Sequence, residues 1–512
     1  IDWKFYKKVF WLALPIALQS LITIGVNMLD TIMVGNLGEM SLSAVSLANQ
    51  FIGVYQIFCM GLGMGASVLV SRYWGMQEAE PVKSIQALRK TICIVVRITV
   101  SLALLFAVVT LLIPQVVMRM YTQDAEIIRL GEIYFRFSVI TYFFLGLSLV
   151  CTIILRCVGQ VKLPLLVSIG AFFVNLLANY VFIFGKLGMP RMGIAGAALG
   201  TLIARLFEAG MICGYLLLKD EKIGFRVKHL GMKTADLLGE YIRISIPVLI
   251  SDGILAIGNN TVAMVIGRLG VTFVAANAIT SVTQQLSTVM IQGVCQAGAI
   301  VTGQTLGEGK QEQAQSQAYR FLGLGLGLGM LSAFFIMAVS PAIIGSYKVS
   351  EETAEVAAQL MHAISLILIF QATNSIMTKG VLRGGGDTKM LMLADNLFLW
   401  VVSIPLGMLA GFVFHFPAFW IYVCLKADQI LKAVWCVFRL RSGKWMKKNN
   451  SWKSFRAGRQ SVKKGSGDSV SVPVFALERE YNMGLQKITE KYLYNEEEYD
   501  GGNSKTARWQ HV

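Results

Sequence analysis

The chain has 512 residues, of which 55% are hydrophobic and only 15% are charged, and its formal net charge is +16. Its mean hydropathy of +0.60 lies far from that of soluble globular domains, which argues against an ordinary soluble fold. The positive charge does not indicate a nucleic-acid-binding protein, because no single domain collects the basic residues on one face.

Apolar segments of about 20 residues or more recur along the chain, and each is long enough to cross about 30 Å of hydrocarbon as a helix. We therefore predict an all-α integral membrane protein with twelve transmembrane helices in two pseudo-symmetric six-helix bundles. The twelfth segment is the least regular, because Lys426, Asp428 and Lys432 interrupt it. In chain order the predicted spans are 9–34, 42–70, 91–118, 128–154, 164–185, 193–218, 239–267, 272–302, 317–345, 353–380, 390–413 and 416–440.

The basic residues between the spans alternate between the two sides of the predicted membrane. One side carries most of them, including Arg72, Lys162 and Lys219, and the positive-inside rule places this side and both termini in the cytoplasm. The predicted parts are an amino-terminal bundle (1–218), a cytoplasmic linker (219–238), a carboxy-terminal bundle (239–440) and a polar cytoplasmic tail (441–512).

The tail begins with a basic segment, 441–464, which holds nine Lys or Arg residues and no acidic residue. Such a segment beside a membrane suits anionic lipid, and it can equally serve as a positive cluster that enforces topology. Residues 465–512 mix charged residues with Gly and Ser, and we expect them to be disordered or loosely helical.

The clearest feature of the sequence is an internal repeat. Residues 15–84 recur at 247–316 without insertion or deletion, at a constant offset of 232, so that Gly75 corresponds to Gly307. Chance similarity between apolar segments is a poor explanation, because glycine, proline and asparagine all keep this register. Two structurally equivalent halves around a shared central cavity are typical of secondary transporters.

A second pair of similar segments, 155–162 and 382–389, lies between the fourth and fifth helices of each half. Together with the repeat, three motifs make the chain similar to the multidrug and toxic compound extrusion (MATE) family over about 5–445. These motifs are Asp30-Thr-Ile-Met-Val-Gly35-Asn-Leu-Gly38 in the first helix, Gly193-Ile-Ala-Gly196-Ala-Ala-Leu-Gly-Thr201 in the sixth, and Leu382-Arg-Gly-Gly-Gly-Asp387 before the eleventh.

The resemblance implies a V-shaped pair of bundles that exports organic cations or other amphipathic compounds by alternating access, against entry of protons or sodium. It implies a transporter of the bacterial plasma membrane and not an enzyme. We expect a monomer whose partners are small organic substrates and membrane lipids, with no nucleic acid and no cofactor beyond the coupling ion, H⁺ or Na⁺. The segment 383–387 lacks the Gly-Lys-Ser/Thr ending of a phosphate-binding loop, so ATP coupling is not expected.

Asp30 is the strongest candidate for a functional residue. It lies deep in the first span, where a carboxylate is costly unless it faces water, a polar partner or a bound cation. One such group could exchange a proton or a sodium ion for substrate, whereas the alternative is a buried hydrogen bond that only packs helices. The residue at the equivalent position of the second half is Val262, so the two halves differ chemically here.

Three polar residues are candidates to support Asp30. Asn175 and Asn179 are four residues apart and share one face of the fifth span. The resemblance places polar partners of the first-helix Asp at these positions, with a carboxylate at the second in some members, and it matches Thr201 to a sixth-helix threonine. Because this chain has Asn179 there, the coupling ion stays open, and simple interhelical hydrogen bonding is the alternative for all three residues.

The second half departs from the resemblance, because Leu255 stands where a seventh-helix Glu is often found and the tenth span contains no acidic residue. This argues against a sodium site there. Three polar residues of the second half are possible contributors to a site, namely Asp252, Asn259 and Asp395.

Two other functions compete with export of organic compounds. A flippase for a lipid-linked precursor from a related superfamily would need a cavity lined by several Arg or Lys residues, and the spans are poor in mid-membrane cations. A membrane sensor or scaffold would depend on its polar tail.

Overall fold

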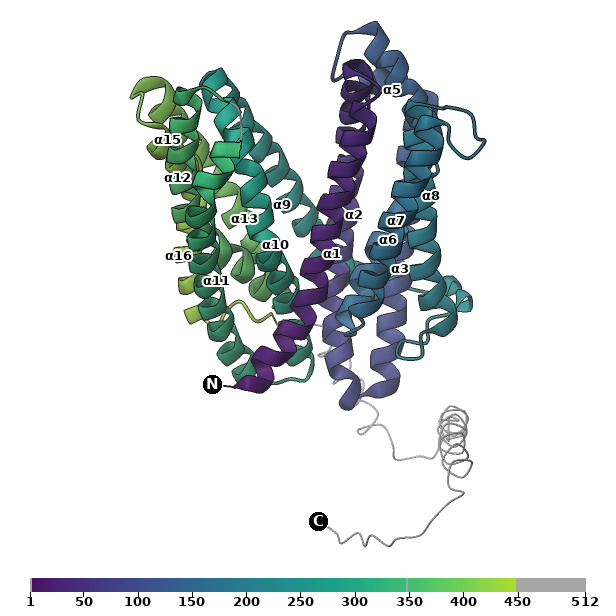
Figure 1. Ribbon diagram of the computed structural model, residues 1–512. Helices are drawn as coiled ribbons and strands as arrows, with labels where there is room; N and C mark the ends of the chain where they lie inside the picture. Colours follow the sequence, from purple (N-terminus) through teal and green to yellow (C-terminus); the bar gives the residue numbers. More distant parts are fainter. Residues whose placement is uncertain (1, 347–348, 448–512) are drawn as a thin grey trace, which may run out of the picture. The chain divides into compact units, whose positions relative to one another are not determined.

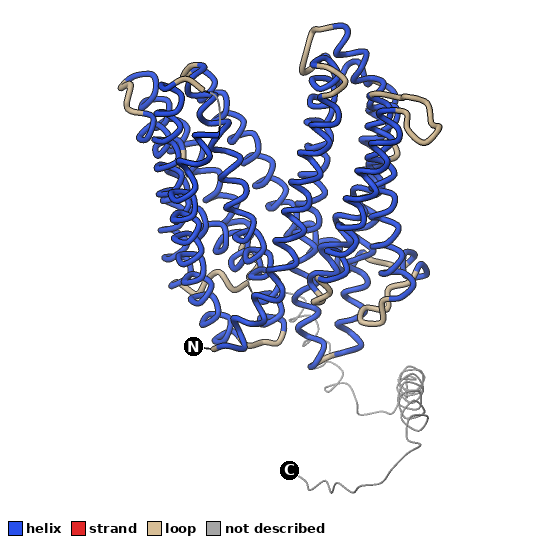
Figure 2. The backbone as a smooth tube through the Cα atoms, viewed as in Figure 1, coloured by secondary structure: helices blue, strands red, loops and turns tan. Residues whose placement is uncertain are grey.

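The computed structural model describes residues 2–346 and 349–447, and these residues form helices joined by loops (Figure 2). Residues 465–512, for which disorder or loose helix is predicted, lie outside the described residues, and so does most of the basic segment 441–464. The first half comprises α1 Trp3–Gly35, α2 Glu39–Gly75, α3 Pro81–Leu112, α4 Pro114–Arg119, α5 Ala125–Ser138, α6 Thr141–Cys157, α7 Lys162–Phe184 and α8 Ile194–Gly214.

The second half repeats this plan with more interruptions. Its π-helical segments are η4 Ile376–Leu382, η5 Phe398–Ser403 and η6 Leu409–Val413. Its α-helices are α9 Ala235–Arg268, α10 Val271–Gly307, α11 Gln311–Ser346, α12 Glu351–Ser375, α13 Thr388–Leu397, α14 Ile404–Met408, α15 Ala418–Leu425 and α16 Ala427–Arg441.

The predicted all-α membrane fold is confirmed. Among the described residues, ten helices are long and apolar enough to cross a membrane, and the number is eleven if the bent pair α5–α6 is counted as one span. The twelfth predicted span is broken into α15 and α16 at Lys426, where the backbone leaves the helical region. This break falls at the first of the charged residues that interrupt the predicted segment.

Two predicted spans have different boundaries in the structure. The predicted span 91–118 crosses a break at Ile113, because Pro114 lacks the amide hydrogen needed to continue α3. The predicted span 128–154 is two helices that meet at an angle of 60°. The charged residues of α5 form ion pairs along that helix, Arg129 with Glu126 and Arg136 with Glu132. Such a pattern of charges is typical of a helix that lies at a protein surface.

The repeat is visible in the backbone. Gly38 and Gly270, which are equivalent residues, precede α2 and α10 with φ angles of 106° and 118°. Residues other than glycine rarely adopt such φ angles, so both glycines are needed for the same reversal of the chain. The pairing of helices is also equivalent, because α1 packs on α10 while α9 packs on α2.

Helices α1–α8 and α9–α16 lie in two groups that approach each other at one end and diverge toward the other (Figure 1). We call the end where they meet the basic end, because it includes Lys8, Arg72 and Arg156. Here Arg72 donates to the carbonyl oxygen of Gly385 over 2.5 Å, and Gln304 donates to that of Cys157 over 2.9 Å. Arg72 and Gln304 are equivalent residues of the repeat, so the same position of each half donates a hydrogen bond to the other bundle, from a charged group in one case and a neutral amide in the other.

Backbone meets backbone at this contact between α2 and α10. A Cβ atom on Gly75 would collide with the carbonyl group of Gln304, and one on Gly307 would collide with the carbonyl group of Arg72. Glycine therefore lets the two bundles touch at two equivalent points. Gly325 of α11 likewise lies against the backbone of α12, at Thr373.

The linker between the halves is attached to the first bundle. Asp220 is buried and accepts hydrogen bonds from Gln160 (2.8 Å) and from the amide of Ile223 (2.9 Å). Arg89 of α3 donates to the carbonyl of Ile223 over 2.9 Å, and Arg97 of α3 donates to the carbonyl groups of residues 230 and 232. The connection is thus held along α3 until α9 begins.

Replacing Gly307 by valine tests the α2–α10 contact. We expect Gly307→Val to cost about 1–3 kcal/mol through overpacking and to lower the apparent Tm of the purified protein. The matched control is Gly323→Val in α11, where an added Cβ meets no atom within 4 Å. Equal Tm values for the two variants would contradict the contact.

Candidate functional site

Asp30 lies in the carboxy-terminal half of α1 and lines a cavity of about 500 Å³ inside the first bundle. The walls of this cavity come from α1, α2, α5, α6 and α8. Both polar and apolar side chains line this cavity. The residues are Asn27, Asp30, Thr31, Val34, Leu42, Val45, Ser46, Asn49, Ile52, Gln56, Tyr134, Ser138, Thr141, Leu145, Thr201 and Arg205.

Asn179 of α7 connects Asp30 to Asn175. Its Nδ2 donates to Oδ1 of Asp30 over 2.6 Å and to Oδ1 of Asn175 over 3.2 Å. An amide nitrogen has two hydrogens, so both bonds can form at once. The structure thus brings three of the four residues predicted for this site into one hydrogen-bonded chain.

A glycine makes room for this amide. Gly200 of α8 lies so close to Asn179 that a Cβ at position 200 would collide with Oδ1 of Asn179. Asn179 is almost fully buried, and its Oδ1 has no hydrogen-bond partner within the described chain. A buried carbonyl oxygen without a donor is costly, and it is also a ready ligand for a cation.

Thr201 follows Gly200 and lines the same cavity as Asp30. Both residues also line a smaller cavity of about 40 Å³ behind α1, together with Asn175 and Arg205. Asp30, Asn175 and Thr201 therefore line one common space, the smaller cavity, and Asn179 belongs to the site through its hydrogen bond to Asp30.

Arg205 and Tyr134 are members of this site that the sequence analysis missed. Arg205 lies one turn after Thr201 and forms an ion pair of 2.6 Å with Glu208. A charged pair at i and i+3 within an otherwise apolar span was a usable signal. Tyr134 of α5 donates to Asn49 over 3.2 Å, and nothing in its sequence context marks it.

The arrangement suits a small monovalent ion or a proton. Carboxylate, amide and hydroxyl oxygens are the ligands that hard cations take. The cavity offers one carboxylate next to neutral oxygens, and the described residues hold no group of three His, Cys, Asp or Glu side chains that could bind a metal.

The comparisons with known proteins agree with the repeat. The family model described as MatE matches twice, at residues 15–181 and 247–409, and the second match begins at the offset found in the sequence. The chain belongs to the MATE family. Members of this family are membrane transporters and not enzymes, and the same holds for this chain.

Relatives and structural neighbours of this MATE transporter cover most of it. The probable multidrug resistance protein NorM of Thermotoga maritima is 24% identical over 446 residues, which is 86% of this chain and 93% of that protein. The NorM protein of Burkholderia vietnamiensis is 28% identical over 403 residues, 77% of this chain and 85% of its own length.

Two solved structures show the same fold. An outward-facing conformation of a multidrug resistance MATE transporter aligns with a TM-score of 0.76 at 18% identity, covering 86% of this chain and 97% of its own. A transporter from Pyrococcus furiosus, described as having a binding pocket of reverse polarity, aligns with a TM-score of 0.75 at 19% identity, covering 86% and 96%.

The polar residues predicted for the second half of this MATE transporter do not join Asp30. Asp252 forms an ion pair with Arg383 over 3.0 Å, and Asp395 is buried beside Lys432 at 3.3 Å. Asn259 lies on an exposed face of α9. Val262, the counterpart of Asp30, is buried. These acidic residues therefore form a separate group in the other bundle.

Replacing Asn179 by alanine tests the bond that holds Asp30. We expect Asn179→Ala to cost about 1–3 kcal/mol, because a largely buried carboxylate loses its donor. The control is Asn36→Ala, since Asn36 donates to Ile32 at the exposed end of α1. Thermal unfolding of the purified variants measures the difference, and identical Tm values would contradict the role assigned to Asn179.

Proposed function

We propose that this MATE transporter is an antiporter that exports amphipathic, cationic organic compounds in exchange for entering protons or sodium ions. The observation that carries the proposal is the placement of Asp30 on the wall of a 500 Å³ cavity, with one carboxylate oxygen bonded to Asn179. A carboxylate in this position can bind either an ion or a substrate cation. Competition for it would couple the two movements.

The relatives support export of organic compounds, because both NorM proteins are named for multidrug resistance. The charge of the cavity supports the same conclusion. Among the described residues that line it, Arg205 is the one cation, and Glu208 pairs with it. A flippase for a phosphorylated lipid would need several unpaired cations at this place.

The proposed cycle uses the contact at the basic end. The positive-inside rule puts this end and both termini in the cytoplasm of a bacterial cell. In this orientation the cavity beside Asp30 opens away from the cytoplasm, and a proton or sodium ion entering there neutralises the carboxylate. Substrate is released, the bonds of Arg72 and Gln304 across the bundles break, and opening of the basic end returns the ion to the cell interior.

Replacing Asp30 by asparagine tests the proposed coupling. We expect Asp30→Asn to abolish efflux while the protein still inserts, because the amide keeps the size of the side chain and removes its charge. Asp236→Asn is the control, since Asp236 is exposed and pairs only with Lys90 across the protein surface. Unchanged drug resistance in cells expressing Asp30→Asn would refute the proposal.

The coupling ion is identified by imposed gradients. Purified protein in vesicles is given a proton gradient or a sodium gradient, and transport of a fluorescent organic cation is followed. We expect one of the two gradients to drive transport in the wild type and to fail in Asp30→Asn. Transport that follows neither gradient would contradict antiport.

A further inference from the structure

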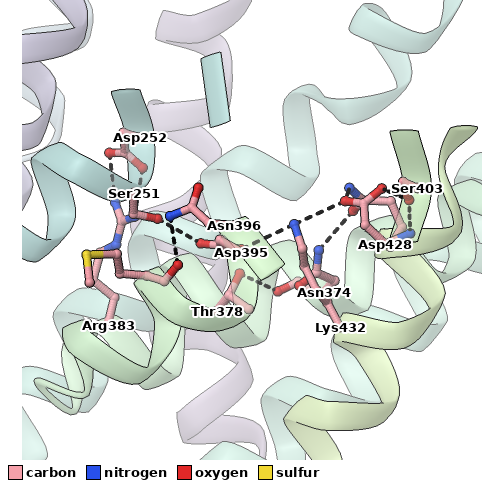
Figure 3. A network of polar contacts seen from close by, with 12 residues as sticks. Ser251, Asp252, Asn374, Thr378, Arg383, Asp395, Asn396, Ser403, Asp428 and Lys432 are labelled. Atoms are coloured by element: carbon pink, nitrogen blue, oxygen red, sulfur yellow. Dashed lines mark hydrogen bonds and ion pairs between the residues drawn. The ribbon is translucent and has the colours of Figure 1, made fainter. Parts of the chain in front are cut away.

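The second bundle contains a buried network of charged side chains that the proposed cycle does not use (Figure 3). At its centre, Nζ of Lys432 lies 3.3 Å from Oδ1 of Asp395 and 3.0 Å from Oδ2 of Asp428. The three side chains are 2–4% exposed. Asp428 and Lys432 are one turn apart on α16, whereas Asp395 comes from α13.

Each carboxylate is also held by neutral donors. Ser251 of α9 donates to Oδ2 of Asp395 over 3.0 Å, and Ser403 of η5 donates to Oδ1 of Asp428 over 3.1 Å. Gln429 donates to Oδ2 of Asp428 over 2.7 Å. Four elements of the bundle therefore fix the positions of the two carboxylates, and Lys432 reaches between them.

The network has an arrangement of charges that an ion-binding site would need. Two buried carboxylates with only neutral donors would carry two negative charges at membrane depth, which is very costly. The ammonium group of Lys432 supplies the positive charge at the point closest to both. Arg383 lies farther along the network and is already paired with Asp252 over 3.0 Å.

An independent observation also points to a cation. Asn374 of α12 is 5% exposed, and its Oδ1 has no hydrogen-bond partner within the described chain. Its Nδ2 donates to Gln429 over 2.8 Å, so this amide belongs to the same network. Two carboxylates and a free amide oxygen make a donor set that a hard monovalent cation can use.

We propose that Lys432 is a tethered cation, whose ammonium group occupies a monovalent-cation site between Asp395 and Asp428. The chain thereby fills with its own side chain a place that would otherwise exchange ions with the solution. This assignment rests on contacts in the second bundle alone. Its consequence, that exchangeable ions are restricted to Asp30, also depends on the proposed function.

The test removes the ammonium group and measures sodium binding without transport. Lys432→Met is made in an Asp30→Asn background, so that the first bundle cannot contribute, and failure of the proposed antiport would not affect the result. Binding of radioactive sodium and the apparent Tm are measured in NaCl and in a matched concentration of choline chloride. Lys310→Met is the control, because it also removes one ammonium group, but from an exposed side chain that pairs with Glu308 outside this network.

We expect Lys432→Met to bind about one sodium ion per chain and to show a higher Tm in NaCl than in choline chloride, since a ligand that binds the folded state stabilises it. The parent and the Lys310→Met variant should show neither effect. Adding Asp428→Asn to Lys432→Met should remove the sodium dependence, because one carboxylate of the pair is then lost.

Three outcomes would overturn the proposal. One is a folded Lys432→Met variant that binds no sodium and has the same Tm in both salts. Another is stabilisation of this variant by acid alone, because the carboxylates would then share a proton instead of binding an ion. The third is a Lys432→Met variant that is unfolded in both salts while Lys432→Met with Asp428→Asn is folded.

Discussion

A charge placed at membrane depth needs a partner, and this requirement explains how two halves of one architecture came to differ. In the first bundle the hydrogen-bond partner of Asp30 is the neutral amide of Asn179, the carboxylate faces a cavity, and the nearby cation Arg205 is paired with Glu208. In the second bundle the carboxylates of Asp395 and Asp428 have an ammonium group between them. The first arrangement leaves room for a cation in the proposed cycle, and in the second an ammonium group of the chain already lies between the carboxylates.

The contact between the bundles has the opposite character, because it keeps the symmetry that the charged residues have lost. Glycines 75 and 307 each face a carbonyl group of the other bundle, and Arg72 and Gln304 each donate to a loop of the other bundle. The repeat is therefore kept at the contact between the bundles, and the departures from it lie among the buried acidic residues.

Much of the fold could be predicted from the sequence. A membrane helix is recognised by its long apolar segment, and a repeat is recognised by residues that match at a constant offset. The ends of the helices were harder to predict. The break at Ile113 follows from Pro114, which was visible, whereas the 60° bend between α5 and α6 has no proline or glycine at the junction to mark it. The basic segment was interpreted from charge alone, although Trp445 within it is buried and bonded to Gln315.

The site was predictable where spacing along one helix decides it, as for Asn175 and Asn179. It was not predictable where it depends on how separate helices are rotated. Tyr134 reaches the cavity, and Lys432 reaches Asp395, only because of such rotations. A sequence shows Lys432 as an interruption of an apolar segment, and only the packed bundle shows it as the partner of two carboxylates.

The linker has a consequence for how far the two bundles can separate. A flexible connection of this length would let them drift apart whenever the contacts at the basic end broke. Here the residues up to position 232 are bound to α3, so very little free chain remains before α9 begins at Ala235. Such a short tether keeps the effective concentration of one bundle near the other very high. The attachment of the linker to α3 therefore limits how far α9 can move away from the first bundle.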